Sequence, residues 1–482
     1  MDPRAPVIAG AGQLSHHGEP RDPVSLAVEA VRAAAQDTGV GDALLRSADS
    51  VRCVAPTSWH LPDMGALVAE AIGAAPRETV QTVMFGGDGP QRLIGDTARS
   101  IAAGDVDVAV VCGSEAVASV LAMRRSGEDA PWPRQPDGTQ PTRVIGTDRA
   151  PVDEQESAAG LLAPVYVYAL LESAERARAG LDPDAHLRRI AELWSGFSQV
   201  AAGNPHAWLR EARSADELAT ASPSNRPVSS PYLKLLTANI QVDQAAALVM
   251  CSAEAAERAG VPRDRWVFAW AGAHAQEEWH VSHRASLAES PAIRAMGRAA
   301  LEHAGVGIDD VAHVDLYSCF PVAVEIAARE LGLGLDRQLT VTGGLTFAGG
   351  PGNAYSLNAT ATLVGLLRED PEAVGLSTAL GWYMTKHAAG LFSASPPPKP
   401  YAFIDADERV ERPAPRAVAP SDHHGPATVE AATVAFTRDG DPEYAIVTAL
   451  TPDGARALVR TEDQDQLATL LNGDPAGLPW EV

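Results

Sequence analysis

The chain has 482 residues, of which 46% are hydrophobic and 21% are charged, and its formal net charge is −24. This composition is typical of a soluble globular protein with two or three domains, and the acidic balance argues against sequence-independent binding to nucleic acid or to an acidic membrane surface. No apolar run is long enough for a membrane-spanning helix, and the first residues enter a strand pattern without signal-peptide features, so we expect a cytoplasmic protein.

Residues 1–125 alternate between short apolar runs, which predict strands, and amphipathic stretches, which predict helices. The expected strands are 6–12, 81–85 and 106–113, and the expected helices are 22–39 and 90–104. Alternation at this spacing predicts an α/β layered fold.

Residues 126–240 interrupt this alternation with a segment rich in Pro, Gly and Asp that contains two expected helices, 164–180 and 184–203. A long insertion between sheet elements is more often functional than not. We therefore expect an insertion domain here.

The alternation resumes over residues 241–395. The expected strands are 243–252, 265–274, 311–318 and 373–382, and the expected helices are 253–260, 290–305 and 322–332. Each half has a strand-to-helix turn with Gly or Ser, in "MFGGDGPQRLI" and in "LYSCFPVAVEI". The pattern predicts an internally duplicated fold.

Residues 396–482 begin with a proline-rich connection, up to about residue 420. After it come three expected strands joined by Asp-Gly turns, and a short helix at 464–473. A small β domain should therefore close the chain.

The order of four segments resembles the thiolase superfamily over residues 5–395: "VDVAVVCGSEAVAS", "DQAAALVM", "GGLTFAGGPGN" and "GLSTALGW". The additional C-terminal domain is similar to that of thiolase-like protein type 1. The resemblance implies a duplicated five-layer αβαβα thiolase fold with an insertion domain and a small OB-like C-terminal β domain.

The resemblance also locates the catalytic positions. In thiolases a cysteine nucleophile lies at a helix N-terminus, where the helix dipole lowers the thiol pKa. Here that position falls at Phe85 to Gly87, with Gly86 the best match. The histidine of the Gly-His-Pro loop corresponds to Gly350, and the second cysteine falls near Leu380. The resemblance therefore implies that a Claisen condensation through a covalent acyl-enzyme is lost.

The four cysteines form no C-x-x-C motif, which argues against a disulfide framework and a zinc site. Cys112 lies near the end of an expected strand, and we interpret it, like Cys53 and Cys251, as a small apolar residue of the core.

Four residues are candidates for catalysis. Tyr317, at the position of the family's Asn-Glu-x-Phe asparagine, and Cys319 precede an expected helix, whose N-terminus favours developing negative charge. His387 lies in the segment that resembles the family's last catalytic loop, where imidazole would carry protons. Tyr383 of the same segment has a hydroxyl that would act as an acid. Structural roles for all four remain open.

Gly86, Asn353 and Tyr355 are candidates for substrate contacts, Asn353 through a thioester carbonyl. Basic residues of the insertion and its borders are candidates for the phosphates of CoA: Arg124, Arg125, Arg226 and Lys234.

Two histidine-rich stretches are interpreted as loops. "HAQEEWHVSH" places His274, His280 and His283 near two glutamates, but the spacing is not that of H-E-x-x-H, so no metal is expected. "SDHHGP" lies in the connection.

The sequence predicts an acyl-CoA-binding protein, with CoA or acyl-CoA as substrate, that performs acyl transfer or forms or cleaves a carbon–carbon bond without the usual cysteine. The alternatives are a catalytically inactive thiolase fold that binds a CoA ester or a protein partner, and a thiolase-like aldolase that needs a partner subunit. Thiolases usually pair through a strand of the first half, and here a homodimer or a monomer is expected.

Overall fold

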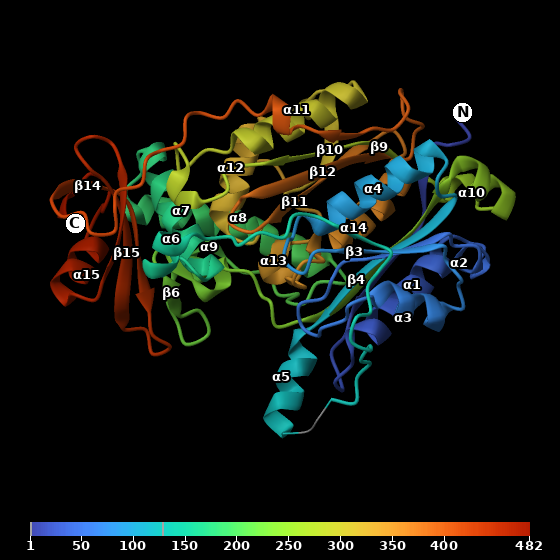
Figure 1. The fold of residues 1–482 in the computed structure, drawn as a ribbon, viewed down its shortest axis with the longest axis horizontal. Coiled ribbons are helices and arrows are strands. Elements are labelled where there is room, and N and C mark those ends of the chain that lie inside the picture. Colours follow the sequence, from blue (N-terminus) through green and yellow to red (C-terminus); the bar gives the residue numbers. More distant parts are fainter. Residues whose placement is uncertain (1, 128–129) are drawn as a thin grey trace.

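The computed structural model describes residues 2–127 and 130–482. A large mixed sheet runs through the molecule in the order β10-β11-β12-β9-β1-β8-β4-β2-β3-β5, with β13 beside β9 (Figure 1). The strands of the first half are β1 (Pro6–Ser15), β2 (Ser50–Cys53), β3 (Glu78–Thr82), β4 (Val108–Ala116), β5 (Arg143–Ile145) and β8 (Asp243–Ser252). Those of the second half are β9 (Val267–Gln276), β10 (Val311–Asp315), β11 (Val374–Gly381), β12 (Lys386–Ser393) and β13 (Phe403–Asp405).

The two parts of the sheet meet where β1 pairs with β9, at Val7 with Phe268 and Ile8 with Val267. β8 lies between β1 and β4. The strand that we expected at the start of the second half therefore belongs to the first part of the sheet.

Two buried helices, α4 (Gly89–Ala103) and α14 (Tyr355–Glu369), lie between the two parts of the sheet and contact strands of both (Figure 1). Helices α1 (Pro23–Asp37) and α3 (Met64–Ile72) cover the outer face of the first part, and α11 (Pro291–Ala304) and α12 (Pro321–Leu331) cover that of the second. This arrangement confirms the predicted five-layer α/β fold. Shorter helices are α2 (Ala43–Arg46), α10 (Ala253–Ala259) and α13 (Gly344–Phe347).

The helix boundaries follow from local signals. α1 begins at Pro23, and the side chain of Asp22 caps it by accepting a hydrogen bond from the Ser25 amide. α4 carries Pro90 in its first turn and ends at Gly104 in the left-handed conformation, as helices commonly do.

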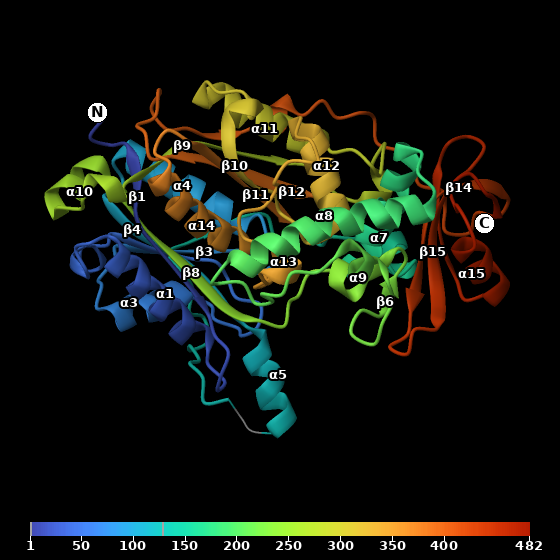
Figure 2. The ribbon, with the colours of Figure 1, turned by 180° about the vertical axis from the view of Figure 1, so that it is seen from behind.

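Helix α5 (Val117–Ser126) ends where the insertion begins, and the insertion itself builds helices α6 (Glu154–Ala158), α7 (Pro164–Ala179), α8 (Pro183–Gly203) and α9 (Ala215–Ala219). Figure 2 shows α7 and α8 between the second half and the C-terminal domain. The short strand β5 pairs with β3 and covers the edge of the first sheet, where an uncovered strand would invite pairing with another chain.

The C-terminal domain contains the expected three strands and helix, β14 (Pro426–Phe436), β15 (Pro442–Leu450), β16 (Arg456–Thr461) and α15 (Gln464–Leu471), together with β17 (Pro479–Glu481). Its sheet has the order β16-β15-β14-β6-β7, with β17 beside β14. Strands β6 (Pro227–Ser229) and β7 (Tyr232–Leu233) come from the insertion, so the two segments form one sheet. Among the described residues no helix is long and apolar enough to cross a membrane.

Candidate functional site

The segment before α4 carries the position that the thiolase resemblance assigns to the nucleophile. We call Gly86, Asp88, Tyr317 and Lys386 the α4 site, because they lie together at the N-terminal end of this helix. A side chain on Gly86 has no room here, since an added Cβ would lie 2.6 Å from Lys386 Nζ and 2.5 Å from Asp88 Oδ1. The space beside Gly86 is therefore filled by an ammonium group and a carboxylate.

Lys386 is the first residue of β12, and its side chain is only 1% exposed. Its Nζ donates to the carbonyl oxygens of Phe85 at 3.0 Å and Thr147 at 3.3 Å, and lies 3.4 Å from Asp88 Oδ1. A buried charge is tolerated only when it is paired and hydrogen-bonded, and here three oxygen atoms surround it. Removal of Asp88 would leave the buried Lys386 ammonium without its carboxylate partner, whereas Asp88 Oδ2 also lies 4.0 Å from Arg92 Nε.

Asp88 and Tyr317 complete the α4 site. The Asp88 side chain is 2% exposed and lies at the N-terminus of α4, where the helix dipole favours a negative charge. The Tyr317 hydroxyl lies 2.4 Å from where a Cβ on Gly87 would stand, so it contacts the backbone of the segment before the helix. Burial, with Cys319 and Asp88 nearby, raises the pKa of Tyr317 well above its ordinary value. The site thus combines an ammonium, a carboxylate and a neutral phenol.

Asn353 supports this segment from the other half of the chain. Its Oδ1 accepts from the Gly86 amide at 3.0 Å, and its Nδ2 donates to the carbonyl oxygens of Ala55 and Met84. The structure therefore brings Asn353 to Gly86, and both the donor and the acceptor group of the Asn353 side chain are engaged with the backbone.

His387 was expected in a loop, but it lies in β12, which pairs with β11 and β9. Successive side chains of a strand point to opposite faces, so His387 projects away from the face that carries Lys386. Its Nε2 lies 3.0 Å from the Met384 carbonyl oxygen. Burial lowers the pKa of His387 to about 3, which keeps the imidazole neutral at physiological pH.

The other candidates are also buried. Burial raises the pKa of Cys319 to about 12, so its thiol stays protonated at neutral pH. The Tyr383 hydroxyl donates to the Leu162 carbonyl oxygen at 2.8 Å. Tyr355 donates to Asp315 Oδ1 at 2.9 Å and packs edge-on against Tyr317. Of the residues expected to act in catalysis, Tyr317 alone is part of the α4 site.

Cys112 lies in β4 and is fully buried, as expected for a core residue. Its Sγ is 3.4 Å from that of Cys53 in the neighbouring strand β2, so two cysteines that are distant in the sequence are neighbours in space, although both are free thiols.

The candidate phosphate contacts do not gather on one element. Arg124 and Arg125 are exposed in the last turn of α5, whereas Arg226 precedes β6 and the exposed Lys234 follows β7.

Sequence reasoning missed Lys386 and Asp88. The available signal was that Lys386 is one of only three lysines in the chain and stands at the start of the mostly apolar stretch "KHAAGLFS". The turn that precedes Lys386 is strained, because Trp382 and Met384 have positive φ angles of 56° and 55°. Such strain clusters at functional sites.

Comparisons with known proteins agree with this architecture. Residues 406–482 match the family model described as the thiolase-like protein type 1 additional C-terminal domain. The whole chain is similar to the crystal structure of a monomeric SCP2-thiolase like protein type 1 from Mycobacterium smegmatis, with 34% identity, a TM-score of 0.85, and coverage of 99% of this chain and 97% of that one.

Two more distant structures share the fold. The Ltp2-ChsH2(DUF35) aldolase is 19% identical, with a TM-score of 0.62, and the match covers 82% of this chain and 99% of that one. Human mitochondrial 3-ketoacyl-CoA thiolase in complex with CoA is 16% identical, with a TM-score of 0.56 and coverage of 82% and 98%. No protein of curated function matches the sequence.

Proposed function

Because the chain belongs to the SCP2-thiolase like protein type 1 family, we propose that it binds a CoA thioester at the α4 site and forms or cleaves a carbon–carbon bond without an acyl-enzyme. The observation that carries this proposal is that Lys386 Nζ fills the space into which a nucleophilic side chain at Gly86 would project. Chemistry that needs proton transfer and oxyanion stabilisation, but no nucleophile, is therefore favoured.

An aldol-type cleavage of a 3-hydroxyacyl thioester meets this condition. The hydroxyl proton goes to a base, the C2–C3 bond breaks, and its electron pair becomes the thioester enolate, which is then protonated at C2. Asp88 would act as the base and return the proton to C2, while the Lys386 ammonium and the Tyr317 phenol would donate hydrogen bonds to the enolate oxygen. The products are a carbonyl compound and a shortened acyl-CoA.

Two fold neighbours support this choice of reaction and ligand, since one is an aldolase and another is a thiolase in complex with CoA. Gly86 and Asn353 would shape the segment before α4, and Gly86 leaves room for Lys386. Roles for Cys319, Tyr383 and His387 stay predictions, and the experiment below tests the role of His387.

The test is a mass-spectrometric assay. The protein is incubated with acetyl-, acetoacetyl-, 3-hydroxyacyl- and branched acyl-CoAs, with and without free CoA. We expect cleavage of a 3-hydroxyacyl-CoA that is lost in Lys386→Met and strongly reduced in Tyr317→Phe. The neighbouring His387→Gln variant, on the opposite face of β12, separates the two assignments. Turnover kept in this variant supports Lys386, whereas turnover lost in this variant alone would make His387 the proton carrier. Equal turnover in Lys386→Met and the parent protein would refute the proposed mechanism.

A second candidate function is a binding protein without catalysis, and one observation favours it. Lys386, Asp88 and Tyr317 are at most 8% exposed, and the Lys386 ammonium is already surrounded by oxygen atoms, so a ligand must displace existing contacts. Tight binding of a CoA ester with no turnover would establish this function instead. Turnover that appears only when a second protein co-purifies would indicate an aldolase completed by a partner subunit.

A further inference from the structure

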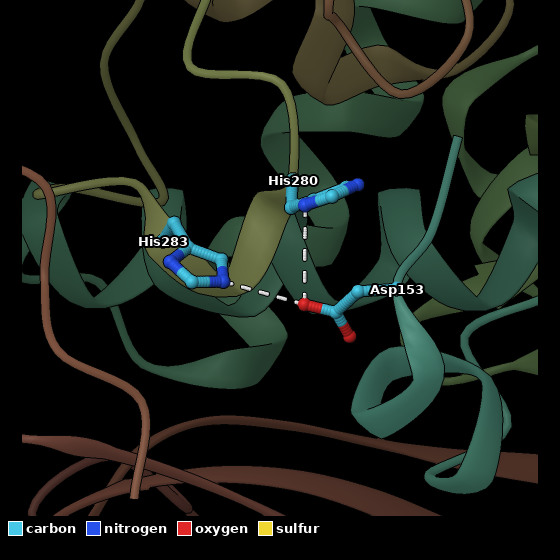
Figure 3. A group of neighbouring side chains, drawn as sticks. All are labelled: Asp153, His280 and His283. Carbon is cyan, nitrogen blue, oxygen red and sulfur yellow. Dashed lines mark hydrogen bonds and ion pairs between the residues drawn. The ribbon is translucent and has the colours of Figure 1, made fainter. Parts of the chain in front are cut away.

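Asp153, His280 and His283 converge at a place where the insertion meets the second half of the chain (Figure 3). Asp153 Oδ2 lies 3.3 Å from His283 Nε2 and 3.9 Å from His280 Nδ1, so one carboxylate oxygen faces both imidazoles. Their potential ligand atoms all lie within 4.8 Å of one another. We propose that these three residues bind one divalent transition-metal ion of the zinc class.

The donor set fits such an ion. Two imidazole nitrogens and one carboxylate oxygen are ordinary zinc ligands, and three protein ligands leave a coordination position for water or another small ligand. Two ligand atoms of one tetrahedral zinc ion lie about 3.4 Å apart. The observed separations need only a small inward movement of the two rings.

A buried carboxylate holds the two sides of the cluster in place. Glu156 Oε1 accepts from the Ser282 amide at 2.7 Å, in the turn that carries both histidines. Its Oε2 accepts from the Asp153 amide at 3.2 Å. Since Glu156 is fully buried, this connection fixes Asp153 relative to the histidine turn, as outer-shell partners do in metal sites.

The orientation of the Asp153 carboxylate is also fixed. Its Oδ1 accepts from the Glu156 amide at 2.8 Å as the N-cap of α6, which leaves Oδ2 for the histidines. A second connection lies beside it, because the Trp279 indole donates to the Ala150 carbonyl oxygen at 2.7 Å. The ligands are therefore positioned by contacts other than the metal.

The three side chains are between 20% and 38% exposed, so an ion can reach them from solution. This distinguishes the cluster from Glu172, His186 and Glu325, which are fully buried. There His186 Nε2 lies 2.6 Å from Glu172 Oε1, which is closer than two ligand atoms of one zinc ion and closer than the 3.3 Å hydrogen bond between His283 Nε2 and Asp153 Oδ2.

The ion would act as a clamp on the segment from Thr147 to Glu156. At one end of this segment the Thr147 carbonyl oxygen accepts from Lys386, and at the other Asp153 would bind the metal. Metal binding would thereby stabilise the segment that touches the α4 site. This inference stands independently of the reaction proposed there.

The test uses the full chain after removal of bound metal with a chelator. Titration with Zn²⁺ should give one site per chain, with binding at least about tenfold weaker in His283→Gln and in Asp153→Asn. Asn is a good N-cap residue, so the second variant keeps α6 intact. The matched control is His274→Gln, which removes a nearby histidine that lies 3.8 Å from Asp405.

Two further readouts separate a lost ligand from a lost fold. Co²⁺ should give visible absorption bands in the parent and in His274→Gln, but not in His283→Gln. Zn²⁺ should raise the midpoint of thermal unfolding of the parent and of His274→Gln, but not that of His283→Gln. No stoichiometric binding by the parent, or equal binding by His283→Gln and His274→Gln, would overturn the proposal.

Discussion

Gly86 should not tolerate even one additional carbon atom. In Gly86→Ala the Cβ would stand 2.5 Å from Asp88 Oδ1 and 2.6 Å from Lys386 Nζ, well inside the 3.4 Å at which ordinary contact begins. Lys386 cannot withdraw freely, because its ammonium is bound to the Phe85 and Thr147 carbonyl oxygens. We expect a loss of about 1–3 kcal/mol in the free energy of unfolding, as for other overpacked cores. For the same reason, Gly86→Cys should not create a thiolase.

The assay is urea unfolding of four proteins: the parent, Gly86→Ala, Lys386→Ala, and the double variant that combines these two changes. Because the clash involves Lys386, the cost of Gly86→Ala should fall in the Lys386→Ala background, with a coupling energy of about 0.5–3 kcal/mol. Gly365→Ala is the matched control, since an added Cβ on this exposed helical glycine meets no atom within 4 Å and should stabilise the protein slightly. A Gly86→Ala variant as stable as the parent would refute the described packing of Lys386 and Asp88.

Three further outcomes are expected. Burial raises the pKa of Glu172 from 4.5 to about 7, so the folded state holds this proton more tightly than the unfolded state. The free energy of unfolding should therefore fall by up to about 3 kcal/mol as the pH rises from 4.5 to 7. Glu172→Gln should flatten the profile of unfolding free energy against pH. Arg456→Met should lower the free energy of unfolding by about 3–5 kcal/mol, because the buried Arg456 side chain binds Glu430 and the carbonyl oxygens of Ser282 and Arg284. An unchanged midpoint of chemical unfolding would contradict this. The four cysteines are buried, and the pKa of Cys319 is raised to about 12. A thiol reagent at pH 8 should therefore label none of them in the folded protein and all four in denaturant. Rapid labelling of the folded chain would contradict this burial.

Adjacent residues show what local sequence cannot decide. Lys386 and His387 both stand in an apolar stretch, and the one chosen from the sequence as a proton carrier was His387. Which of two neighbours in a strand faces the α4 site depends on the register of β12 against β11 and β9. β11 is joined to β12 by a short turn, but β9 and Phe85 lie far from β12 in the sequence, so the role of Lys386 is visible only after folding.

Short-range patterns determined much of the architecture: the alternating halves, most of their strands and helices, and the C-terminal β domain. These features depend on residues that are close together in the sequence. Tertiary structure alone decided three others. It brought β6 and β7 of the insertion into the C-terminal sheet, placed Lys386 against Phe85, and put Asp153 beside His280 and His283. Each of these contacts joins residues far apart in the sequence, and its existence depends on how whole layers pack, which no local pattern encodes.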